Sequence, residues 1–481
     1  MASTNVVSAA KSVLIGSFIS KGISFLSSII LARILLPDDY GSLILATIIT
    51  GLIGQIGSMG FELYYLQYKG SDSEKLFVLN QVYILRLITN SIIFLVQSLL
   101  GLYLIFFMES EVSGGIIIML AVSLLIEAFN SPQEAILKDK IDFKRITVGN
   151  IYREVFGTIA KISAAFLGLG GLSFGFGPII GSLTRLIYYR NIVSYKLDDF
   201  QLDKNKISEI FKFGKHLLFA SIGSYFVQQI DKIIITSFFS KEDAGKYSFS
   251  WNIAAMPFNY LIVPQAQLNL SYITKFKQGD FSLFEKLSIV QKMIFTFFFP
   301  VILFLILFVE EGIVLLFTEK WIDTTPIVSI LLVYYTFQSI TFPFSGVING
   351  LGRPEINSKI IIIRFCVLVP ALLIAVFYFP GMLIYTYIFV LISLIFDFLK
   401  MIFSFKLIDG LNKQAIGRLW IELLFFFLIL IVSFINFDSS IFKILTFFGL
   451  NFLFISLSLV FNRQMFFESF LLFKRSIISK I

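Results

Sequence analysis

The sequence predicts an all-α polytopic membrane protein with about fourteen transmembrane helices. Of the 481 residues, 57% are hydrophobic and only 15% are charged, which is too apolar for a soluble protein of this length. Apolar stretches of about 20 residues, the length that crosses a hydrocarbon core, recur along the whole chain. Lys and Arg are distributed very unevenly between alternate loops, as in multi-pass membrane proteins.

The individual spans follow from the apolar stretches between charged or Gly-containing turns. Helices are expected because barrel strands would appear as alternating segments of about ten residues. The fourteen stretches lie near residues 11–36, 40–66, 76–107, 112–136, 146–168, 171–193, 211–239, 245–272, 287–317, 325–350, 357–379, 381–408, 416–436 and 440–462.

Charge on the loops predicts the orientation of these helices. When charges toward the end of a span are counted with the adjoining loop, 29 of the 39 Lys and Arg residues fall on the side of the N-terminus, 5 fall on the opposite side and 5 are assigned to the spans themselves. Cytoplasmic loops hold the excess of positive charge, so both termini are expected in the cytoplasm. The formal net charge of +8 is explained in the same way, and no nucleic-acid partner is predicted.

The chain is expected to consist of two six-helix lobes followed by two further helices. The longest loop is charged and divides the apolar region into similar halves. We therefore predict an N-lobe at 1–193, a cytoplasmic linker at 194–210, a C-lobe at 211–408, and two helices with a cytoplasmic tail at 409–481.

An internal repeat supports this division. Moving the second half over the first by 204 residues aligns Asp39 with Asp243 and Gly41 with Gly245, and a later offset of 211 aligns Arg153 with Arg364. Because six spans precede the second copy, both copies enter the membrane from the same side. The sequence therefore predicts parallel repeats related by an axis along the membrane normal.

Polar residues form a stripe on the first helix of each copy. They recur at steps of three or four residues, which places them on one helical face. Such a stripe faces protein or water, either as hydrogen-bonding contacts between helices or as the wall of a water-filled cavity between the halves. The stripes consist of Ser17, Lys21, Ser24 and Ser28 in the first copy, and of Ser221, Tyr225, Gln228 and Lys232 in the second.

The second helix of each copy carries an equivalent polar residue beside an interruption. Gln55 and Asn259 correspond at the offset of 204. Gly and Pro in corresponding helices indicate a binding region or hinge, although tight packing is an alternative for any one Gly. These interrupting residues are Gly51, Gly54, Gly57 and Gly60 in the first copy, and Pro257 and Pro264 in the second.

Ionisable residues inside spans are candidates for the transport path, because each costs about 2.5 to 3.5 kcal/mol to insert. More cations than anions in a cavity favour an anionic substrate, and buried carboxylates are candidates for proton or cation coupling. Structural ion pairs and side chains that reach the interface are the alternatives. Cations of the path are Lys21, Arg86, Arg153, Lys161 and Lys232; candidate coupling residues are Glu127, Glu154, Asp231 and Asp397.

Catalytic and metal-binding constellations are excluded by composition. The chain contains 1 Cys and 1 His, so it has no disulfide framework, Cys/His metal cluster or Ser-His-Asp triad. We therefore expect no enzyme, no metal site and no cofactor other than a coupling ion, for which H⁺ and Na⁺ are the candidates.

Several stretches resemble the Wzx-type polysaccharide and O-antigen flippases, within the multidrug/oligosaccharidyl-lipid/polysaccharide exporter superfamily. The chain is most similar to the branch that contains colanic acid and teichuronic acid exporters. The resemblance spans residues 10 to about 400 but does not extend to specific substrate contacts. The matching stretches are LARILLPDDYGSLILA (31–46), ILKDKIDFKRI (136–146), the segment 213–261, LLFTEKWIDTTPIVSILLV (315–333) and INGLGRPEI (348–356).

The resemblance implies a transporter for surface polysaccharide biosynthesis, such as O-antigen, capsule or exopolysaccharide. Such proteins move undecaprenyl-pyrophosphate-linked oligosaccharide from the cytoplasmic to the outer leaflet of the bacterial inner membrane by alternating access. Partners implied in the same way are the lipid bilayer and the polysaccharide polymerase and chain-length machinery. The motif residues Asp39, Gly41, Gly245, Trp321 and Pro354 are expected to be architectural.

Three alternatives remain open at this point. Two alternatives belong to the same superfamily: a peptidoglycan lipid-precursor flippase and a drug/cation antiporter. A cation exporter should have an acidic cavity, whereas the intramembrane residues here are mainly basic. The alternative from another class is a membrane-embedded polysaccharide polymerase or acyltransferase. A polymerase usually has a large loop on the outer side of the membrane, whereas the largest loop here is predicted on the cytoplasmic side.

Overall fold

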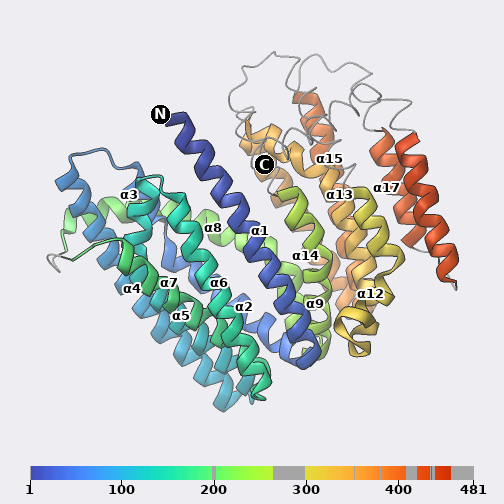
Figure 1. Ribbon diagram of the computed structural model, residues 1–481, viewed down its shortest axis with the longest axis horizontal. Coiled ribbons are helices and arrows are strands. Elements are labelled where there is room, and N and C mark those ends of the chain that lie inside the picture. Colours follow the sequence, from blue (N-terminus) through green and yellow to red (C-terminus); the bar gives the residue numbers. More distant parts are fainter. Residues whose placement is uncertain are drawn as a thin grey trace. The chain divides into compact units, whose positions relative to one another are not determined.

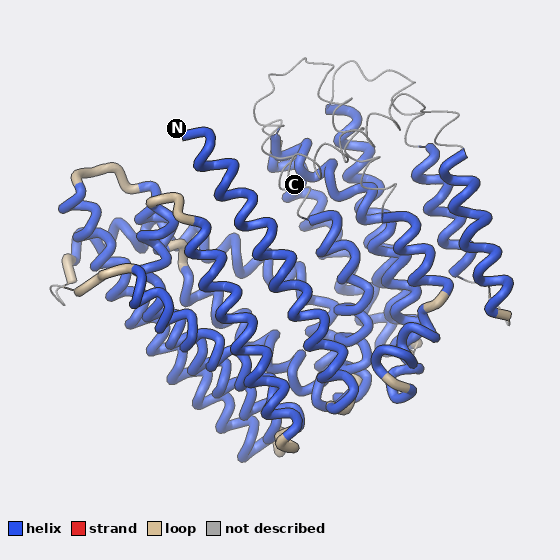
Figure 2. Tube along the Cα trace, viewed as in Figure 1, coloured by secondary structure: helices blue, strands red, loops and turns tan. Residues whose placement is uncertain are grey.

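The fold is helical throughout the part of the chain that the structure describes. This structure is a computed structural model that describes residues 2–197, 202–263, 298–350, 353–379, 381–407, 420–433, 435 and 439–456. Within these ranges the backbone contains helices and short connecting loops, with no strand (Figure 2). The chain divides into two compact units, Met1–Ser248 and Phe249–Ile481.

The N-terminal unit contains long helices that run beside one another (Figure 1). A short 3₁₀ turn, Gly170–Leu172, precedes α7. The helices are α1 Ala2–Ile34, α2 Pro37–Ser58, α3 Phe61–Gln67, α4 Asp72–Phe107, α5 Glu111–Asp139, α6 Phe143–Phe166, α7 Ser173–Ile192, α8 Lys204–Phe238 and the first part of α9 Lys241–Pro257.

The C-terminal unit is also built from helices. A π-helical segment, Phe258–Ile262, continues α9, and a 3₁₀ segment, Glu319–Thr324, joins α12 to α13. The other described helices are Phe298–Leu307, α12 Val309–Phe317, α13 Thr325–Gly350, α14 Pro354–Tyr378, α15 Met382–Leu407, α17 Trp420–Ser433 and Ser440–Ser456.

The predicted fold class, an all-α polytopic membrane protein, is confirmed. Each of the fourteen predicted spans overlaps helical backbone in the described ranges. Seven helices there are long and apolar enough to cross a membrane, or eight when Phe298–Leu307 and Val309–Phe317, bent by 79°, count as one span. Helices such as α6 fall short of that hydropathy because they carry polar faces directed at other helices or at a cavity.

Capping residues explain where several helices begin. Ser71 and Glu74 form a reciprocal capping box at the start of α4, with the Glu74 carboxylate accepting from the Ser71 amide at 2.7 Å. Asp203 accepts from the Lys206 amide at the start of α8. One turn later Lys206 donates to Glu209 at 2.7 Å, and this hydrogen bond holds the pKa of the Glu209 carboxyl below its ordinary value.

Helix α5 lies at the centre of the N-terminal unit, where it contacts α2, α4 and α7. Small residues allow the backbones to approach closely. A methyl group at Gly157 of α6 would lie 2.7 Å from the Gly177 carbonyl oxygen of α7, and one at Gly101 of α4 would lie 2.7 Å from the Gly114 carbonyl oxygen of α5. The pair Gly157 and Gly177 fixes the spacing of α6 and α7, beside the site described below.

The first turns of α2 and α9 form a symmetric contact between the two sequence repeats. A methyl group on Gly41 would collide with the Lys241 carbonyl oxygen, and one on Gly245 would collide with the Pro37 carbonyl oxygen. Pro37 precedes Gly41 by four residues, as Lys241 precedes Gly245, so the two contacts are equivalent at the repeat offset of 204. The contact is self-complementary, as expected at a two-fold axis relating parallel repeats.

Asp39 has the architectural role expected from its motif. Its carboxylate accepts from the Leu36 amide at 2.9 Å and from the Gly171 amide at 2.7 Å. It therefore caps the start of α2 and ties this turn to the 3₁₀ turn before α7.

Both predicted helix interruptions occur, in different forms. In the first copy α2 ends at Ser58, Met59 and Gly60 have positive φ angles of 32° and 65°, and α3 begins at Phe61. In the second copy the backbone after Pro257 becomes π-helical and contains Asn259. Pro264 lies outside the described residues. A π-helical segment often marks a functional region. The equivalence of Gln55 and Asn259 as residues of the transport path stays a prediction.

Aromatic packing holds the described part of the C-terminal unit together. Trp321, which is fully buried, stacks on Phe249 with ring centroids 4.0 Å apart. A second group joins Phe299, Phe425 and Phe454, with centroids 4.7 to 5.0 Å apart. Trp321 is therefore a core residue, as expected from its motif.

Candidate functional site

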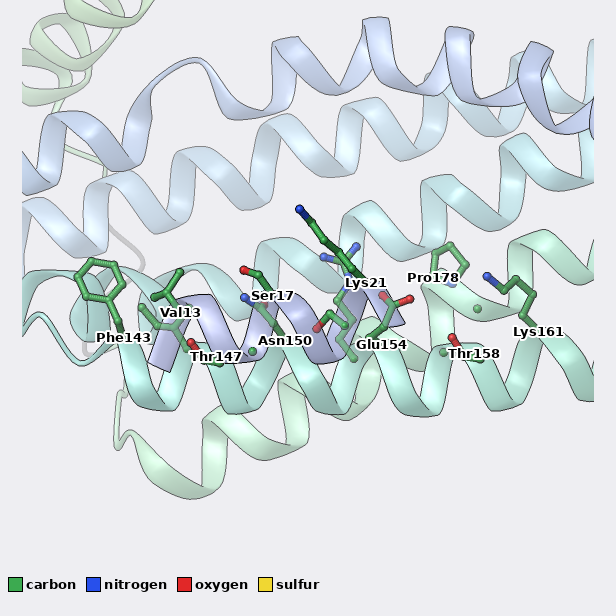
Figure 3. Close-up of a pocket in the computed structure, with 16 residues that line it drawn as sticks. Val13, Ser17, Lys21, Phe143, Thr147, Asn150, Glu154, Thr158, Lys161 and Pro178 are labelled. Carbon is green, nitrogen blue, oxygen red and sulfur yellow. The ribbon is translucent and has the colours of Figure 1, made fainter. Parts of the chain in front are cut away.

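A groove of about 660 Å³ lies between α1, α6 and α7 of the N-terminal unit (Figure 3). We call it the α6 groove. It follows one face of α6 from Phe143 to Lys161, which corresponds to a rise of about 27 Å at 1.5 Å per residue. That length approaches the hydrocarbon thickness of about 30 Å. Its lining comprises Val13, Gly16, Ser17, Ser20, Lys21, Phe143, Ile146, Thr147, Asn150, Arg153, Glu154, Gly157, Thr158, Lys161, Gly177 and Pro178.

The charged lining of the α6 groove is mainly cationic. Lys21 enters it from α1, and Arg153, Glu154 and Lys161 enter it from α6. Figure 3 shows Glu154 and Lys161 on the same side of α6, and Lys21 projecting from α1. Three cations and one carboxylate give the lining a formal charge of +2. This sign suits an anionic ligand, since Lys and Arg bind phosphate and carboxylate through charge-assisted hydrogen bonds.

Glu154 links the polar stripe of α1 to α6. The Ser24 hydroxyl donates a hydrogen bond to Glu154 Oε1 at 2.8 Å. Ser17 and Lys21 of the same stripe line the groove, whereas the Ser28 hydroxyl donates to the Phe25 carbonyl of its own helix. In this stripe, therefore, Ser17 and Lys21 face a cavity and Ser24 contacts α6.

Arg153 is held beside the groove by Glu127 of α5. Its Nε lies 3.6 Å from Glu127 Oε1, and its side chain remains 43% exposed. The other Glu127 oxygen pairs with Arg185 of α7, and Ser182 donates to Glu127 Oε1 at 2.7 Å. Arg185 also donates to Asn150, a groove residue, at 3.3 Å. One carboxylate thus anchors two arginines, of which Arg153 reaches the groove and Arg185 is buried.

The ion pairs continue from Arg185 to partly exposed residues of α3, α4 and α5. Glu134 Oε2 lies 3.7 Å from Arg185, and Glu134 Oε1 pairs with Lys138 at 2.9 Å. Lys138 also pairs with Glu62 at 2.8 Å, and Glu62 lies 3.9 Å from Arg86. Arg86, predicted as a path residue, is therefore placed in this network instead of among the groove-lining residues.

The polar stripe of α8 is placed partly in contact with α2. The Tyr225 hydroxyl donates to the Ile48 carbonyl at 2.8 Å, and Gln228 donates to Ser224 of its own helix at 2.8 Å. Ser221 donates to the Leu218 carbonyl. Lys232 lies one turn beyond Gln228 on α8. The Tyr225 contact is the interhelical hydrogen bond that was the alternative to a cavity role.

The remaining predicted residues are spread over both units. Gln55 donates to the Gly51 carbonyl of α2 at 3.4 Å. Asp231 is 2% exposed and accepts a hydrogen bond from Tyr247 at 2.9 Å. In the C-terminal unit, Asp397 is equally buried and pairs with Lys400 of the same helix at 3.1 Å. The role of Asp231 and Asp397 in ion coupling stays a prediction.

Sequence reasoning missed three residues that the structure places at the groove or behind it. Arg185 counts among the cytoplasmic charges in the sequence, yet its side chain is 7% exposed and lies in the ion-pair network. Asn150 and Thr158 line the groove. Their spacing from Glu154, four residues on either side, was a usable signal, because such positions share a helical face.

Comparison with known proteins places the chain in a family. Over 301 residues, 62% of this chain and 61% of the relative, it is 21% identical to the teichuronic acid biosynthesis protein TuaB of Bacillus subtilis (strain 168). It is 22% identical over 442 residues to the lipopolysaccharide biosynthesis protein WzxC of Escherichia coli (strain K12), which covers 89% of this chain and 87% of that protein.

A solved structure and a family model complete the comparison. The fold matches the lipid II flippase MurJ in an inward closed conformation with a TM-score of 0.67 at 18% identity, covering 94% of this chain and 99% of that one. The model of the family described as polysaccharide biosynthesis protein matches residues 30–326. The chain is therefore a multi-pass membrane protein that belongs to the polysaccharide biosynthesis protein family.

Proposed function

We propose that this protein is a transporter that moves undecaprenyl-pyrophosphate-linked oligosaccharide repeat units from the cytoplasmic to the outer leaflet of the bacterial inner membrane. Its product would serve surface polysaccharide assembly, with a polymerase and chain-length machinery acting next. Both termini would lie in the cytoplasm, as the loop charges indicate. Membership of the polysaccharide biosynthesis family and the MurJ-like fold support a transporter of this class.

The α6 groove is the observation that carries the proposal. It offers a polar, net cationic surface along about 27 Å of helix in a chain whose surroundings are apolar. A diphosphate and the sugars attached to it need such a surface, while the polyprenyl chain can stay in the bilayer. An exporter of organic cations would need the opposite charge, because a cationic lining repels its substrate.

The direct test is to delete the gene in its own host and to analyse the lipid-linked repeat units and the surface polysaccharide. We expect repeat units to accumulate on the cytoplasmic leaflet while surface polysaccharide disappears. Loss of lipid II transport with intact polysaccharide would indicate the peptidoglycan-precursor alternative. Increased drug sensitivity with intact polysaccharide would indicate the antiporter alternative, and either result would overturn the proposal.

Replacing one groove cation should slow transport without unfolding the protein. We expect Lys21→Gln and Arg153→Gln each to reduce the transport rate about tenfold, since a charge-assisted hydrogen bond to an anion contributes about 1.5 kcal/mol or more. The measurement is the rate of surface polysaccharide synthesis in the deletion strain at equal protein expression. Lys144→Gln is the matched control, because Lys144 is exposed on the first turn of α6 outside the groove lining. Unchanged rates in both groove variants would contradict the cationic-path interpretation.

Four carboxylates are candidates for coupling to an ion gradient: Glu127, Glu154, Asp231 and Asp397. Of these four, Glu154 lines the α6 groove. Glu127 pairs with both Arg153 and Arg185, so a coupling ion at its carboxylate would have to displace two arginines. We therefore rank Glu154 first for coupling to H⁺ or Na⁺ within the N-terminal unit.

A further inference from the structure

Thr158 of α6 is a buried polar residue whose hydroxyl is directed to no partner among the described residues. The residue is 8% exposed, and its Oγ1 has no hydrogen-bond partner. It also lines the α6 groove. Buried polar atoms are nearly always paired, and leaving one unpaired costs about 1 to 3 kcal/mol. This hydroxyl therefore has an unmet hydrogen bond at the wall of the groove.

Lys161 lies three residues beyond Thr158, one turn along the same face of α6. Within the described residues it makes no hydrogen bond or ion pair. The missing side chain at Gly177 gives it room, because a methyl group there would lie 3.3 Å from Lys161 Cβ. In Figure 3 the Lys161 side chain leans back along α6 with its amine toward Pro178. A lysine and a threonine thus line the same end of the groove, one helical turn apart.

This end of the groove is distinct from the part that Lys21 and Arg153 line. Arg153 and Lys161 are eight residues apart, which corresponds to about 12 Å along the helix axis. Side chains on a helix lean toward its N-terminus, so both head groups shift in the same direction and their separation is preserved. A single diphosphate is much shorter than this distance and contacts one of the two positions at a time.

We propose that Thr158 and Lys161 form a second anion-binding station in the α6 groove, separate from a first station at Lys21 and Arg153. This inference rests on the proposed transport of a lipid-linked oligosaccharide. The ligand is an anionic oxygen that accepts from both the Lys161 ammonium and the Thr158 hydroxyl. Two sources supply such an oxygen: the diphosphate linker after it leaves the first station, and the carboxylate of an acidic sugar held while the diphosphate occupies that station.

Equilibrium binding to the purified full-length protein in lipid nanodiscs separates these sources. The probes are farnesyl diphosphate and its conjugates with glucose and with glucuronate. If the station holds an acidic sugar, wild-type protein binds the glucuronate probe about tenfold more tightly than the glucose probe, and Lys161→Gln and Thr158→Val abolish that preference. If it holds the diphosphate, wild-type protein binds two equivalents of farnesyl diphosphate and both variants bind one.

The controls distinguish a lost contact from a damaged protein. Thr158→Ser keeps the hydroxyl and should restore what Thr158→Val loses, and Lys144→Gln should bind every probe as wild type does. If Arg153→Gln weakens binding of all probes but Lys161→Gln and Thr158→Val do not, the second station is wrong while the proposed function stands. If wild-type protein binds none of the probes, the proposed function fails and the station fails with it.

Discussion

Replacing Arg185 by leucine is expected to lower the free energy of unfolding by about 3 to 5 kcal/mol, because removing one partner of a buried ion pair leaves the other charge uncompensated. The Arg185 side chain is 7% exposed, and it pairs with Glu127 and Glu134 while donating to Asn150. The variant should therefore lose thermal stability and yield when purified in detergent. The measurement is unfolding of the purified protein by SDS titration in mixed micelles, followed by circular dichroism.

Two further variants determine whether the ion pair itself is responsible. Glu127→Leu combined with Arg185→Leu should cost less than the sum of the single changes by at least about 1 kcal/mol, since the two charges interact directly. Arg145→Leu is the matched control: Arg145 pairs with Asp142 on the surface with its side chain 53% exposed, so its loss should cost at most about 1 kcal/mol. Strict additivity of the Glu127 and Arg185 changes would contradict the network.

Adding a single methyl group at Gly245 is expected to lower the free energy of unfolding by about 3 kcal/mol, the upper part of the range for overpacking. The methyl would collide with the Pro37 carbonyl oxygen, and main chain cannot move aside as a flexible side chain does. The symmetric contact predicts the same loss for Gly41→Ala, where the obstacle is the Lys241 carbonyl oxygen. Both variants are measured by the same unfolding titration.

The control for this pair is a helical glycine with open space around it. Nothing lies within 4 Å of a methyl group built on Gly223 of α8. Gly223→Ala should therefore stabilise the protein by up to about 1 kcal/mol, because alanine is the better helix former. If Gly245→Ala unfolds at the same SDS concentration as wild type, the contact between the first turns of α2 and α9 does not exist as described.

Sequence alone predicted the helical fold because membrane spans are determined by local composition. Each span is recognisable from its own apolar residues, and the repeat follows from matching positions such as Gly41 and Gly245. Helix breaks were predictable for the same reason: Gly60 permits the positive φ angle at which the chain leaves α2, and Pro257 has no backbone N–H to donate within α9. The division into two compact units after Ser248 depends on which helices pack together, and a local sequence pattern does not contain that information.

The candidate site was predictable only in part, because it depends on which helices pack together. The seven-residue spacing of Glu154 and Lys161 placed them on one face of α6, and both line the groove. Sequence could not show that α7 brings Arg185 against Glu127, or that Tyr225 of α8 would bond to the α2 backbone. Periodicity identifies a polar face, whereas the partner of that face is a property of the tertiary fold.

The most direct test of the central claim is a transport measurement with purified protein. The full-length chain is reconstituted into liposomes that contain a fluorescent polyprenyl-diphosphate-linked oligosaccharide, and the exposure of the probe to a membrane-impermeant quencher is followed over time, with and without a pH or sodium gradient. We expect wild-type protein to move the probe between leaflets faster than protein-free liposomes do, and Arg153→Gln to be about tenfold slower than wild type. Movement no faster than in protein-free liposomes, with folded protein present under every gradient, would contradict the central claim.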